Sequence, residues 1–177
     1  MSITDLTALP AAAAPEWLTR VGIPAGWRVG RYMGDGAIEP WSAAVRGERA
    51  DGTWDACETI VVFGFTGIPV AQDVWELCES SLRALNADNI VVVEIDTPPE
   101  QGVSVVSGSG LFLVDDRLIH GQFNYYTVGS PLVGQGRMIQ QCLYVDASRR
   151  AEFEAALARL GDELHNAFVN GPACRSG

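Results

Sequence analysis

LFLVDDRLIHGQFNYYTV, residues 111–128, decides the fold, because Asp115 and Asp116 lie between two runs of β-prone residues. Paired aspartates between such runs are most simply turn formers. Residues 110–114 and 118–127 are therefore predicted to be strands that meet at this tight turn.

The rest of the sheet is predicted from short β-prone runs on both sides of this turn. Residues 137–145 alternate apolar with other side chains, which fits an antiparallel sheet with one covered face. An Asp51-Gly52 pair between two further runs predicts a second hairpin. The glycine-rich residues 107–110 predict a bulge or turn, because no helix follows them to hold an anion. The other predicted strands are residues 41–49, 58–65, 89–95 and 103–106.

Two amphipathic helices are predicted, one before and one after the main run of strands. Pro69 suits the first turn of a helix, and apolar residues recur at helical spacing from there to residue 85. Asp146 or Ser148 is expected to cap the second helix. The apolar stripe of the first helix is Val70, Val74, Leu77, Cys78, Leu82 and Leu85, and that of the second is Phe153, Leu157, Leu160, Leu164 and Phe168.

The order of these elements predicts the fold class and the domain boundaries. Strands grouped in this way favour an α+β sandwich, in which an antiparallel β-sheet is flanked by two amphipathic α-helices, over a parallel sheet wound through βαβ units. A Rossmann-type nucleotide crevice loses its scaffold, and the chain has no G-x-G-x-x-G string. We expect a flexible N-terminal tail over residues 1–20, a single domain over residues 21–168, and a C-terminal tail over residues 169–177.

The composition of the chain excludes several classes of function. Of its 177 residues, 47% are hydrophobic and 19% are charged, and the formal net charge is -10. An acidic surface repels phosphate backbones and anionic lipid heads, so we expect no nucleic-acid partner. All 12 basic residues are arginines, which excludes Schiff-base chemistry and a Walker-type phosphate lysine.

The sequence also predicts where the protein resides. No run approaches the roughly 18 apolar residues that a membrane-spanning helix needs, and no Lys or Arg precedes Arg20 to form the basic region of a secretory signal. The first cysteine is Cys57, so a lipoprotein signal is also missing. We therefore expect a cytoplasmic protein, or one of the cell envelope if a further segment precedes Met1.

The four cysteines do not predict a metal site. They are scattered along the chain, without a C-x-x-C pair and without a histidine at zinc-finger spacing. Cys78 and Cys142 lie inside periodic elements and are expected to be buried free thiols. A disulfide between Cys57 and Cys142 stays open as an alternative. We expect no metal and no cofactor.

His120 is the sharpest candidate for chemistry. The string VDDRLIHGQ, residues 114–122, looks like the signature of mannose/sorbose-type phosphotransferase IIB subunits, in which the histidine is phosphorylated. An imidazole nucleophile with Arg117 to neutralise phosphate is sound chemistry. In that family, however, the string opens an α/β domain near the N-terminus, whereas here strand-forming runs lie on both sides of it. We therefore expect His120 on a strand without a catalytic role, and His165 on a helix surface.

Aromatic residues supply the remaining candidates, because the chain holds five tryptophans and four tyrosines. Trp27 and Trp75 are predicted to fill the core between helix and sheet. Trp41 and Trp54, near loop or hairpin positions, and Tyr126, on a strand, are predicted to line a groove. Aromatic surfaces of this kind suit protein partners or apolar ligands.

The element order and several short strings resemble one known family. The strings are IPAGW at residues 23–27, GSGLFLVDDRLIHGQFNYYTV at 108–128, GRMIQQCLYVDA at 136–147, and ALARLGDEL at 156–164. Over residues 21–168 the chain resembles the LpqN/LpqT family of actinobacterial proteins, whose fold is similar to the PsbP-like superfamily. The resemblance implies an antiparallel sheet flanked by helices. It supplies no catalytic residues, and the lipid-bearing cysteine typical of LpqN-type proteins is missing here.

The resemblance also implies a mostly non-enzymatic role, because members of the superfamily serve as accessory proteins of photosystems and of nuclear transport, as envelope lipoproteins, and as chaperones for secreted effectors. We expect a non-enzymatic binding or adaptor domain that recognises a protein partner or an apolar ligand through Trp41, Trp54 and Tyr126. A chaperone for a secreted effector is an alternative, and a phosphocarrier that uses His120 is a further one. A homodimer is also left open.

Overall fold

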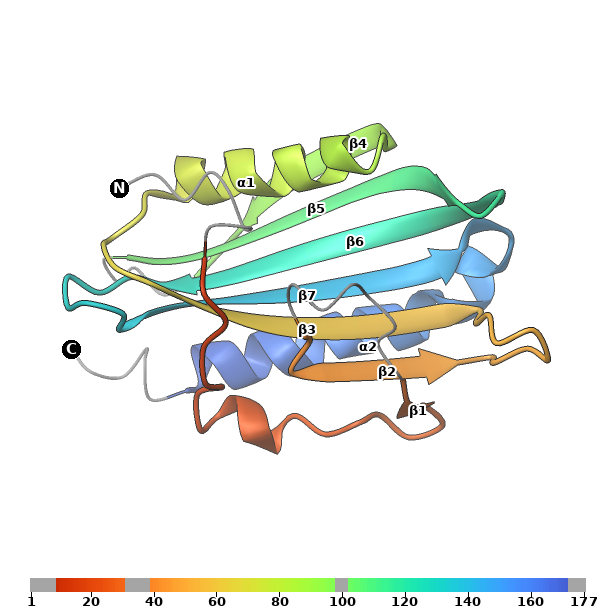
Figure 1. Ribbon diagram of the computed structural model, residues 1–177, viewed down its shortest axis with the longest axis horizontal. Helices are drawn as coiled ribbons and strands as arrows, with labels where there is room; N and C mark the ends of the chain where they lie inside the picture. Colours follow the sequence, from red (N-terminus) through yellow and green to blue (C-terminus); the bar gives the residue numbers. More distant parts are fainter. Residues whose placement is uncertain (1–8, 31–38, 98–101, 172–177) are drawn as a thin grey trace.

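The computed structural model describes residues 9–30, 39–97 and 102–171, and it shows an antiparallel sheet between two helices (Figure 1). The predicted α+β class is therefore confirmed. In chain order the elements are η2 (Leu18–Arg20), β1 (Arg28–Val29), β2 (Ser42–Arg46), β3 (Ala56–Phe65), α1 (Ala71–Ala84), β4 (Asp88–Ile95), β5 (Val103–Val114), β6 (Arg117–Val128), β7 (Gly136–Asp146), η3 (Ala147–Arg149) and α2 (Arg150–Val169).

The seven strands lie in the order β1-β2-β3-β7-β6-β5-β4, and all neighbours are antiparallel. The chain runs from β1 to β3 at one side of the sheet, and α1 then carries it to the far edge, where β4 lies. From there β5, β6 and β7 meander back until β7 pairs with β3. The β3–β7 pairing therefore joins the two parts of the sheet, with β7 in the middle and β1 and β4 at the edges.

The turn between β5 and β6 is the predicted aspartate turn. Val114 pairs with Arg117, and Asp115 and Asp116 between them have φ values of 47° and 64°. Positive φ at both central residues is the geometry of a type I′ turn, whose twist matches that of the two strands it joins. The central hairpin is therefore confirmed in register and in turn residues.

Of the bulge or turn predicted at residues 107–110, the turn is wrong, because these residues lie inside β5, which pairs with β6 without a register shift. The β4–β5 ladder does shift register at this point, between the pairs Asp88–Leu111 and Val91–Ser109, and the extra residue is on β4. Gly108 faces α1, and a Cβ added there would lie 2.4 Å from Sγ of Cys78. Glycine is therefore needed for the close approach of helix and strand, not for a change of chain direction.

One face of the sheet, called the α1 face below, packs against α1 over β4, β5 and β6. Four of the six residues of the predicted stripe are buried there: Val74, Leu77, Cys78 and Leu82. Val70 and Leu85 are exposed because they lie just outside the helix, which begins at Ala71 and ends at Ala84. Trp75 packs half-buried against the same cluster.

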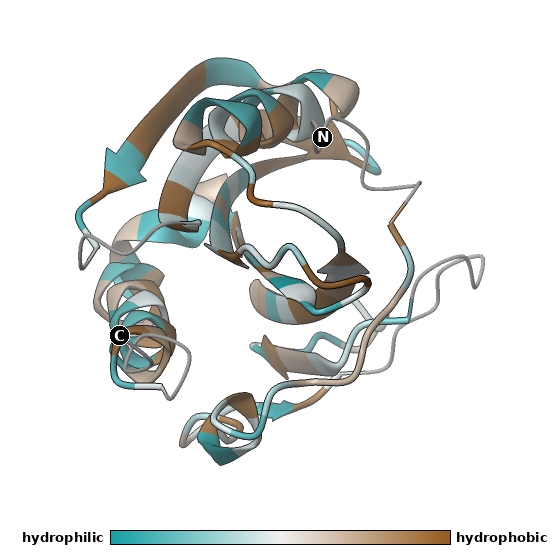
Figure 2. Ribbon diagram, turned by 90° about the vertical axis from the view of Figure 1, so that its left-hand side faces the viewer, coloured by the Kyte–Doolittle hydropathy of each residue, from teal (hydrophilic) through white to brown (hydrophobic). Residues whose placement is uncertain are grey.

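The opposite face, called the α2 face below, is covered by α2, so the two helices lie on opposite sides of the sheet (Figure 2). All five stripe residues predicted for this helix are buried. Trp27 is buried in the same layer, near Phe153. The second helical stripe and the core role of Trp27 are therefore confirmed.

A row of buried polar side chains crosses the sheet beneath α2. Ser107 donates to Oδ1 of Asn124 (2.7 Å), and Asn124 donates to Oε1 of Gln141 (2.8 Å). Gln141 in turn donates to Oε1 of Glu58 (2.7 Å). These hydrogen bonds follow the strand register and satisfy polar groups that would otherwise be costly to bury.

The predicted N-terminal tail over residues 1–20 needs correction over its described part, residues 9–20. Leu9, Trp17 and Leu18 are buried, and the Trp17 ring meets Phe168 edge to face at 5.8 Å. These apolar side chains hold the segment in place, because they pack into the hydrophobic clusters of the domain. Residues 1–8 lie outside the described residues.

The backbone of this segment also extends the sheet. β2 pairs with β3 only as far as Ile60. Beyond that point Ala12 donates to the carbonyl of Val62, and Gly64 donates to the carbonyl of Pro10, both at 3.0 Å. The N-terminal segment therefore continues the line of β2 along the edge of β3.

Candidate functional site

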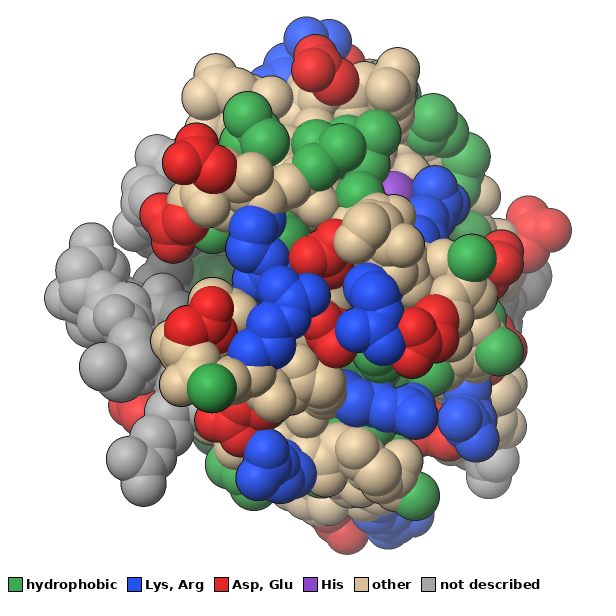
Figure 3. All heavy atoms as spheres, turned by 90° about the vertical axis from the view of Figure 1, so that its right-hand side faces the viewer, with side chains coloured by type: hydrophobic (Ala, Val, Ile, Leu, Met, Phe, Trp, Pro, Cys, Tyr) green, Lys and Arg blue, Asp and Glu red, His purple; other side chains and the backbone are tan. Residues whose placement is uncertain are grey.

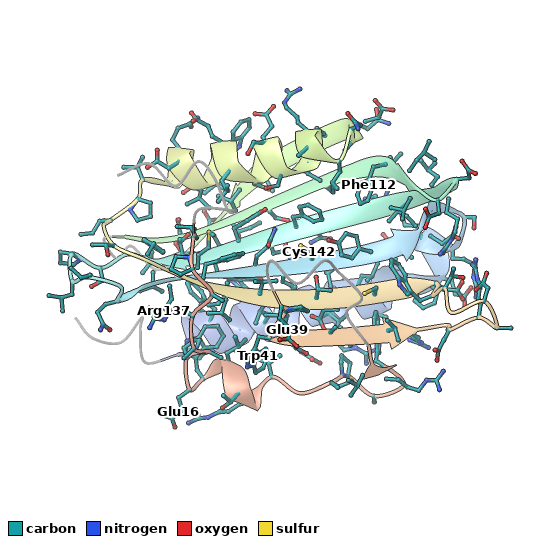
Figure 4. All side chains as sticks on the ribbon, viewed as in Figure 1. Glu16, Glu39, Trp41, Phe112, Arg137 and Cys142 are labelled. Carbon is teal, nitrogen blue, oxygen red and sulfur yellow. The ribbon has the colours of Figure 1, made fainter. Side chains whose placement is uncertain are left out.

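A groove of 1080 Å³ lies on the α1 face. It lies beside α1, over β2, β3, β7 and part of β6, where the helix does not reach. Figure 4 shows Phe112 and Cys142, two of the lining residues, on this face. Side chains that form its floor and walls include Val61, Phe63, Phe112, Ile119, Cys142 and Tyr144.

Strand alternation decides which side chains reach the groove. On β3, Cys57, Thr59 and Val61 line it, while the residues between them, Glu58 and Ile60, turn to the α2 face. Every second residue of a strand faces the same side. The groove floor is therefore built from one residue in two of each strand, a pattern that a search for a continuous motif does not detect.

The floor of the groove is uncharged. Burial raises the pKa of the thiols of Cys57 and Cys142 to about 12, so both stay protonated at neutral pH. Both are free thiols, so the alternative of a disulfide between them is wrong for this structure. Protonated buried thiols behave as small apolar groups. Thr59 and Gln140 add polar side chains to this lining.

Aromatic rings form one wall of the groove. The Tyr144 ring lies 6.2 Å from Trp54 and 6.2 Å from Phe112, and it meets Phe112 nearly at a right angle. It also lies 5.7 Å from Phe123, again edge to face. Aromatic rings favour such edge-to-face arrangements. The wall is therefore a set of rings that pack against one another through Tyr144.

Trp54 is held in place by Arg117. The Nη2 atom of Arg117 donates to the Trp54 carbonyl (2.6 Å) and to Oδ2 of Asp146 (3.1 Å). The guanidinium carbon also lies 5.7 Å from the Trp54 ring centroid, a cation–π distance. The arginine that the sequence suggested for phosphate neutralisation therefore supports a groove residue.

Asp146 belongs to a network of ion pairs at this end of the sandwich. Arg49 pairs with both Asp55 and Asp146, and Arg149 pairs with Asp55 at 2.8 Å. Figure 3 looks at this end and shows arginine side chains interleaved with carboxylates. Hydrogen bonds from Ser148 and Arg117 hold the pKa of Asp146 well below its ordinary value. The network ties the β2–β3 loop, which carries Trp54, to the ends of β6 and β7.

The three residues predicted to line a groove do not lie together. Trp54 lines the groove described above. Trp41 directly precedes β2 and is 38% exposed (Figure 4), but it is not among the lining residues. Tyr126 is only 2% exposed and lies on the α2 face, 5.2 Å from the Phe168 ring. Tyr125 packs on the α1 face. Because neighbouring residues of a strand face opposite sides, Tyr126 faces away from the groove.

His120 lies on β6, within the hairpin that the sequence predicted. Its side chain is on the α2 face and only 8% exposed. Burial lowers the pKa of this imidazole, and the charge of Arg150 lowers it further. It lines a hollow of 240 Å³ that is separate from the groove. His165 lies on α2, half-buried, with its ring 6.2 Å from Tyr126.

Metal-binding clusters and membrane-spanning helices also bear on function. Within residues 9–30, 39–97 and 102–171, no group of three or more His, Cys, Asp or Glu side chains is placed to hold a metal ion. Over the same ranges, no helix has the length and apolar character to cross a lipid bilayer.

Comparison with known proteins supports a distant relation in fold. No family model matches the sequence, and no curated protein matches it. Among solved structures, the fold is similar to that of LpqN, a protein involved in cell envelope biogenesis of Mycobacterium tuberculosis, with a TM-score of 0.56. The match covers 85% of this chain and 79% of that one, at 12% sequence identity. At this identity, the resemblance that the sequence suggested is supported as a shared fold.

Proposed function

We propose that this protein is a non-enzymatic binding domain that holds an elongated apolar ligand in the groove on the α1 face. The observation that carries the proposal is an uncharged floor of mainly apolar side chains beneath 1080 Å³ of open space. Water forms few hydrogen bonds with such a surface. The hydrophobic effect therefore favours an apolar ligand that removes this surface from water.

The size of the groove favours a long ligand. Small-molecule sites in proteins usually occupy about 300–1,000 Å³, and this groove, at 1080 Å³, lies just above that range. It runs across several strands, from Val45 on β2 to Phe112 on β5. A chain-like or multi-ring apolar molecule fits this shape better than a compact metabolite does.

The groove suits an apolar molecule better than an extended peptide. Three strands of its floor, β3, β7 and β6, lie inside the sheet with a strand on each side, and only the short strand β1 and the outer side of β2 lie at the edge. An extended peptide binds a sheet mainly through unpaired backbone groups at an edge, and most of this floor offers none. A charged ligand is disfavoured as well, because a buried charge would find no counter-charge on the floor.

Charges lie at the rim of the groove and not inside it. Arg28 of β1 and Glu48 of the β2–β3 loop both line the site and form an ion pair with each other. Both side chains are largely exposed. A ligand that carries one polar end could place that end near this pair while its apolar part lies on the floor.

The relation to LpqN is compatible with a non-catalytic role. LpqN is involved in cell envelope biogenesis, and we extend only its fold, not its process or partners, to this chain. The described residues place no nucleophile next to a base in the groove, since its two thiols are kept protonated by burial.

A fluorescent probe tests the proposal. N-phenyl-1-naphthylamine is neutral and apolar, and its emission rises in an apolar site. We expect saturable binding at one site per chain. Val61→Glu, which places a carboxylate on the half-buried groove floor, should weaken this binding at least about tenfold, because the probe cannot neutralise the charge.

The matched control is Val133→Glu, which introduces the same charge at a loop position that is 88% exposed. It should bind the probe as the wild type does. Trp54→Ala, which removes one ring of the wall while leaving the floor intact, gives a second measure and should also weaken binding. Circular dichroism verifies the fold of each variant. Equal affinity in the wild type, Val61→Glu and Trp54→Ala would show that the probe binds elsewhere and would overturn the proposal.

A further inference from the structure

A second concave feature lies on the α2 face, away from the groove. It is a hollow of 240 Å³ between β4, β5, β6 and the start of α2. Two bases, His120 and Arg150, line it together with Ser109 and Gln122. The exposed side chains of Val91 and Val93 form its outer border.

His120 has no hydrogen-bond partner for its imidazole within the described part of the chain. Neither ring nitrogen is a fully buried polar atom that lacks a hydrogen bond. The residue as a whole is only 8% exposed, and it lines the hollow. A molecule in the hollow would therefore meet an imidazole that is free to bind it.

Arg150 is a positively charged residue that lines the same hollow as this imidazole. It is the first residue of α2 and is exposed, and it forms no ion pair with any acidic residue that the structure describes. Its neighbour Arg149, by contrast, pairs with both Asp55 and Glu152. Arg46, Arg137 and Arg159 also form no ion pair with the acidic residues that the structure describes. Arg150 differs from them because it lines the hollow together with His120.

The wall of the hollow excludes carboxylates and adds neutral hydrogen-bonding groups. None of its lining residues is Asp or Glu, although the chain has 22 acidic residues. The Ser109 hydroxyl is on the wall, and so is the Gln122 amide, whose Nε2 also donates to Asn124 at 3.2 Å. Cationic and neutral donors around a space without acids are the features of an oxyanion site.

We propose that this hollow binds a small oxyanion of the phosphate type between His120 and Arg150. The guanidinium supplies charge-assisted hydrogen bonds, and the imidazole supplies one more when it is protonated. The anion binds reversibly and no covalent bond forms. This site is independent of the proposed groove ligand, because the two features lie on opposite faces of the sheet.

Binding should strengthen as the pH falls. A bound anion favours the charged imidazole, so phosphate and a proton promote each other's binding. Arg150 is the charged group on the wall, and its position opposes protonation until an anion arrives. The groups that face His120 are Val91 and Val93 from β4, Ser109 from β5, Val145 from β7 and Arg150 from α2.

Nuclear magnetic resonance tests the proposal directly, since the chain has only two histidines. Inorganic phosphate is titrated into labelled protein, with chloride replaced so that the ionic strength stays constant. The imidazole signals of His120 should move in a saturable manner, and its apparent pKa should rise. Those of His165, at the opposite end of α2, should not move.

Arg150→Gln should weaken phosphate binding by about tenfold, because it removes a charge-assisted contact. Arg159→Gln is the matched control, since it removes the same charge from an exposed position of the same helix. It should bind as the wild type does. Failure of His120 to respond to phosphate, or equal weakening by both variants, would overturn the proposal.

A parallel titration with glycerol phosphate distinguishes a free ion from a phosphate monoester. Binding as tight as that of inorganic phosphate supports the site and assigns it to a phosphate monoester. Weaker binding that still needs Arg150 supports the site for the free ion. Neither outcome depends on the naphthylamine probe, so the two proposed sites can fail separately.

Discussion

The close approach of α1 to β5 predicts the effect of adding one methyl group. In Gly108→Ala the new Cβ would lie 2.4 Å from Sγ of Cys78 and 3.1 Å from Cδ1 of Leu82. The first distance is about 1 Å shorter than ordinary contact between such atoms. Either Cys78 must leave its rotamer or α1 must move outward, and both disturb the packing of the α1 face.

The cost can be worked from general values. Overpacking a core typically costs about 1–3 kcal/mol, and replacing glycine by alanine in a strand returns about 0.5–1 kcal/mol of backbone entropy. We therefore expect a net loss of about 1–2 kcal/mol in the free energy of unfolding. For a domain of this size that lowers Tm by about 2–8 °C. The groove should change as well, since Leu85, next to the helix end, lines it.

Urea denaturation followed by circular dichroism measures the effect, and a double-mutant cycle isolates its cause. Cys78→Ala removes the clashing sulfur, so the double variant should recover at least about 1 kcal/mol relative to the sum of the two single changes. Gly22→Ala is the control, because an added methyl group there meets no atom within 4 Å. A Gly108→Ala protein as stable as the wild type, or a coupling energy near zero, would refute the packing argument.

Three further predictions concern titration and reactivity. Burial and the nearby charge of Glu163 raise the pKa of Glu58, so the wild type loses stability as the pH rises from the unfolded-state pKa through the folded one. The Glu58→Gln side chain does not titrate. The free energy of unfolding of this variant, relative to that of the wild type, should therefore increase over that pH range, and a difference that stays constant with pH would contradict this expectation. Cys57 and Cys142, with pKa values of about 12, should resist iodoacetamide at pH 8 until urea unfolds the chain, as peptide mapping by mass spectrometry can show. Incubation with a phosphoryl donor should leave no acid-labile phosphate on His120, and labelling that His120→Ala abolishes would revive the phosphocarrier alternative.

Local sequence signals predicted most of the secondary structure. The alternation at residues 137–145, the Asp115-Asp116 turn and the two helical stripes each depend on residues close together in the chain, and the structure contains all of them. The role of Gly108 is set by α1, some 30 residues earlier in the chain, and that of Gly110 by Ala87 and Asp88, which follow the helix. A glycine required for close packing cannot be distinguished by sequence from one required for a turn.

The residues that line the candidate sites could mostly not be predicted from the sequence. Strand β6 is buried on both faces over most of its length, so its composition does not reveal which helix covers which face. Tyr126 was therefore placed in a groove although it packs under α2. The groove itself arises because α1 is shorter than the strands it covers and lies at one side of a wide sheet. Only Trp54 carried a local signal, its place at a hairpin.

The way the N-terminal segment extends the line of β2 has a practical consequence for handling the protein. Ala12 and Pro10 cover backbone groups of β3 that β2 leaves free. A shortened chain that starts at Trp17 would expose this stretch of edge, and a bare edge recruits strands from other molecules. The self-association of such a truncated protein should increase with its concentration. An affinity tag is therefore better attached after Gly177 than directly before Leu9.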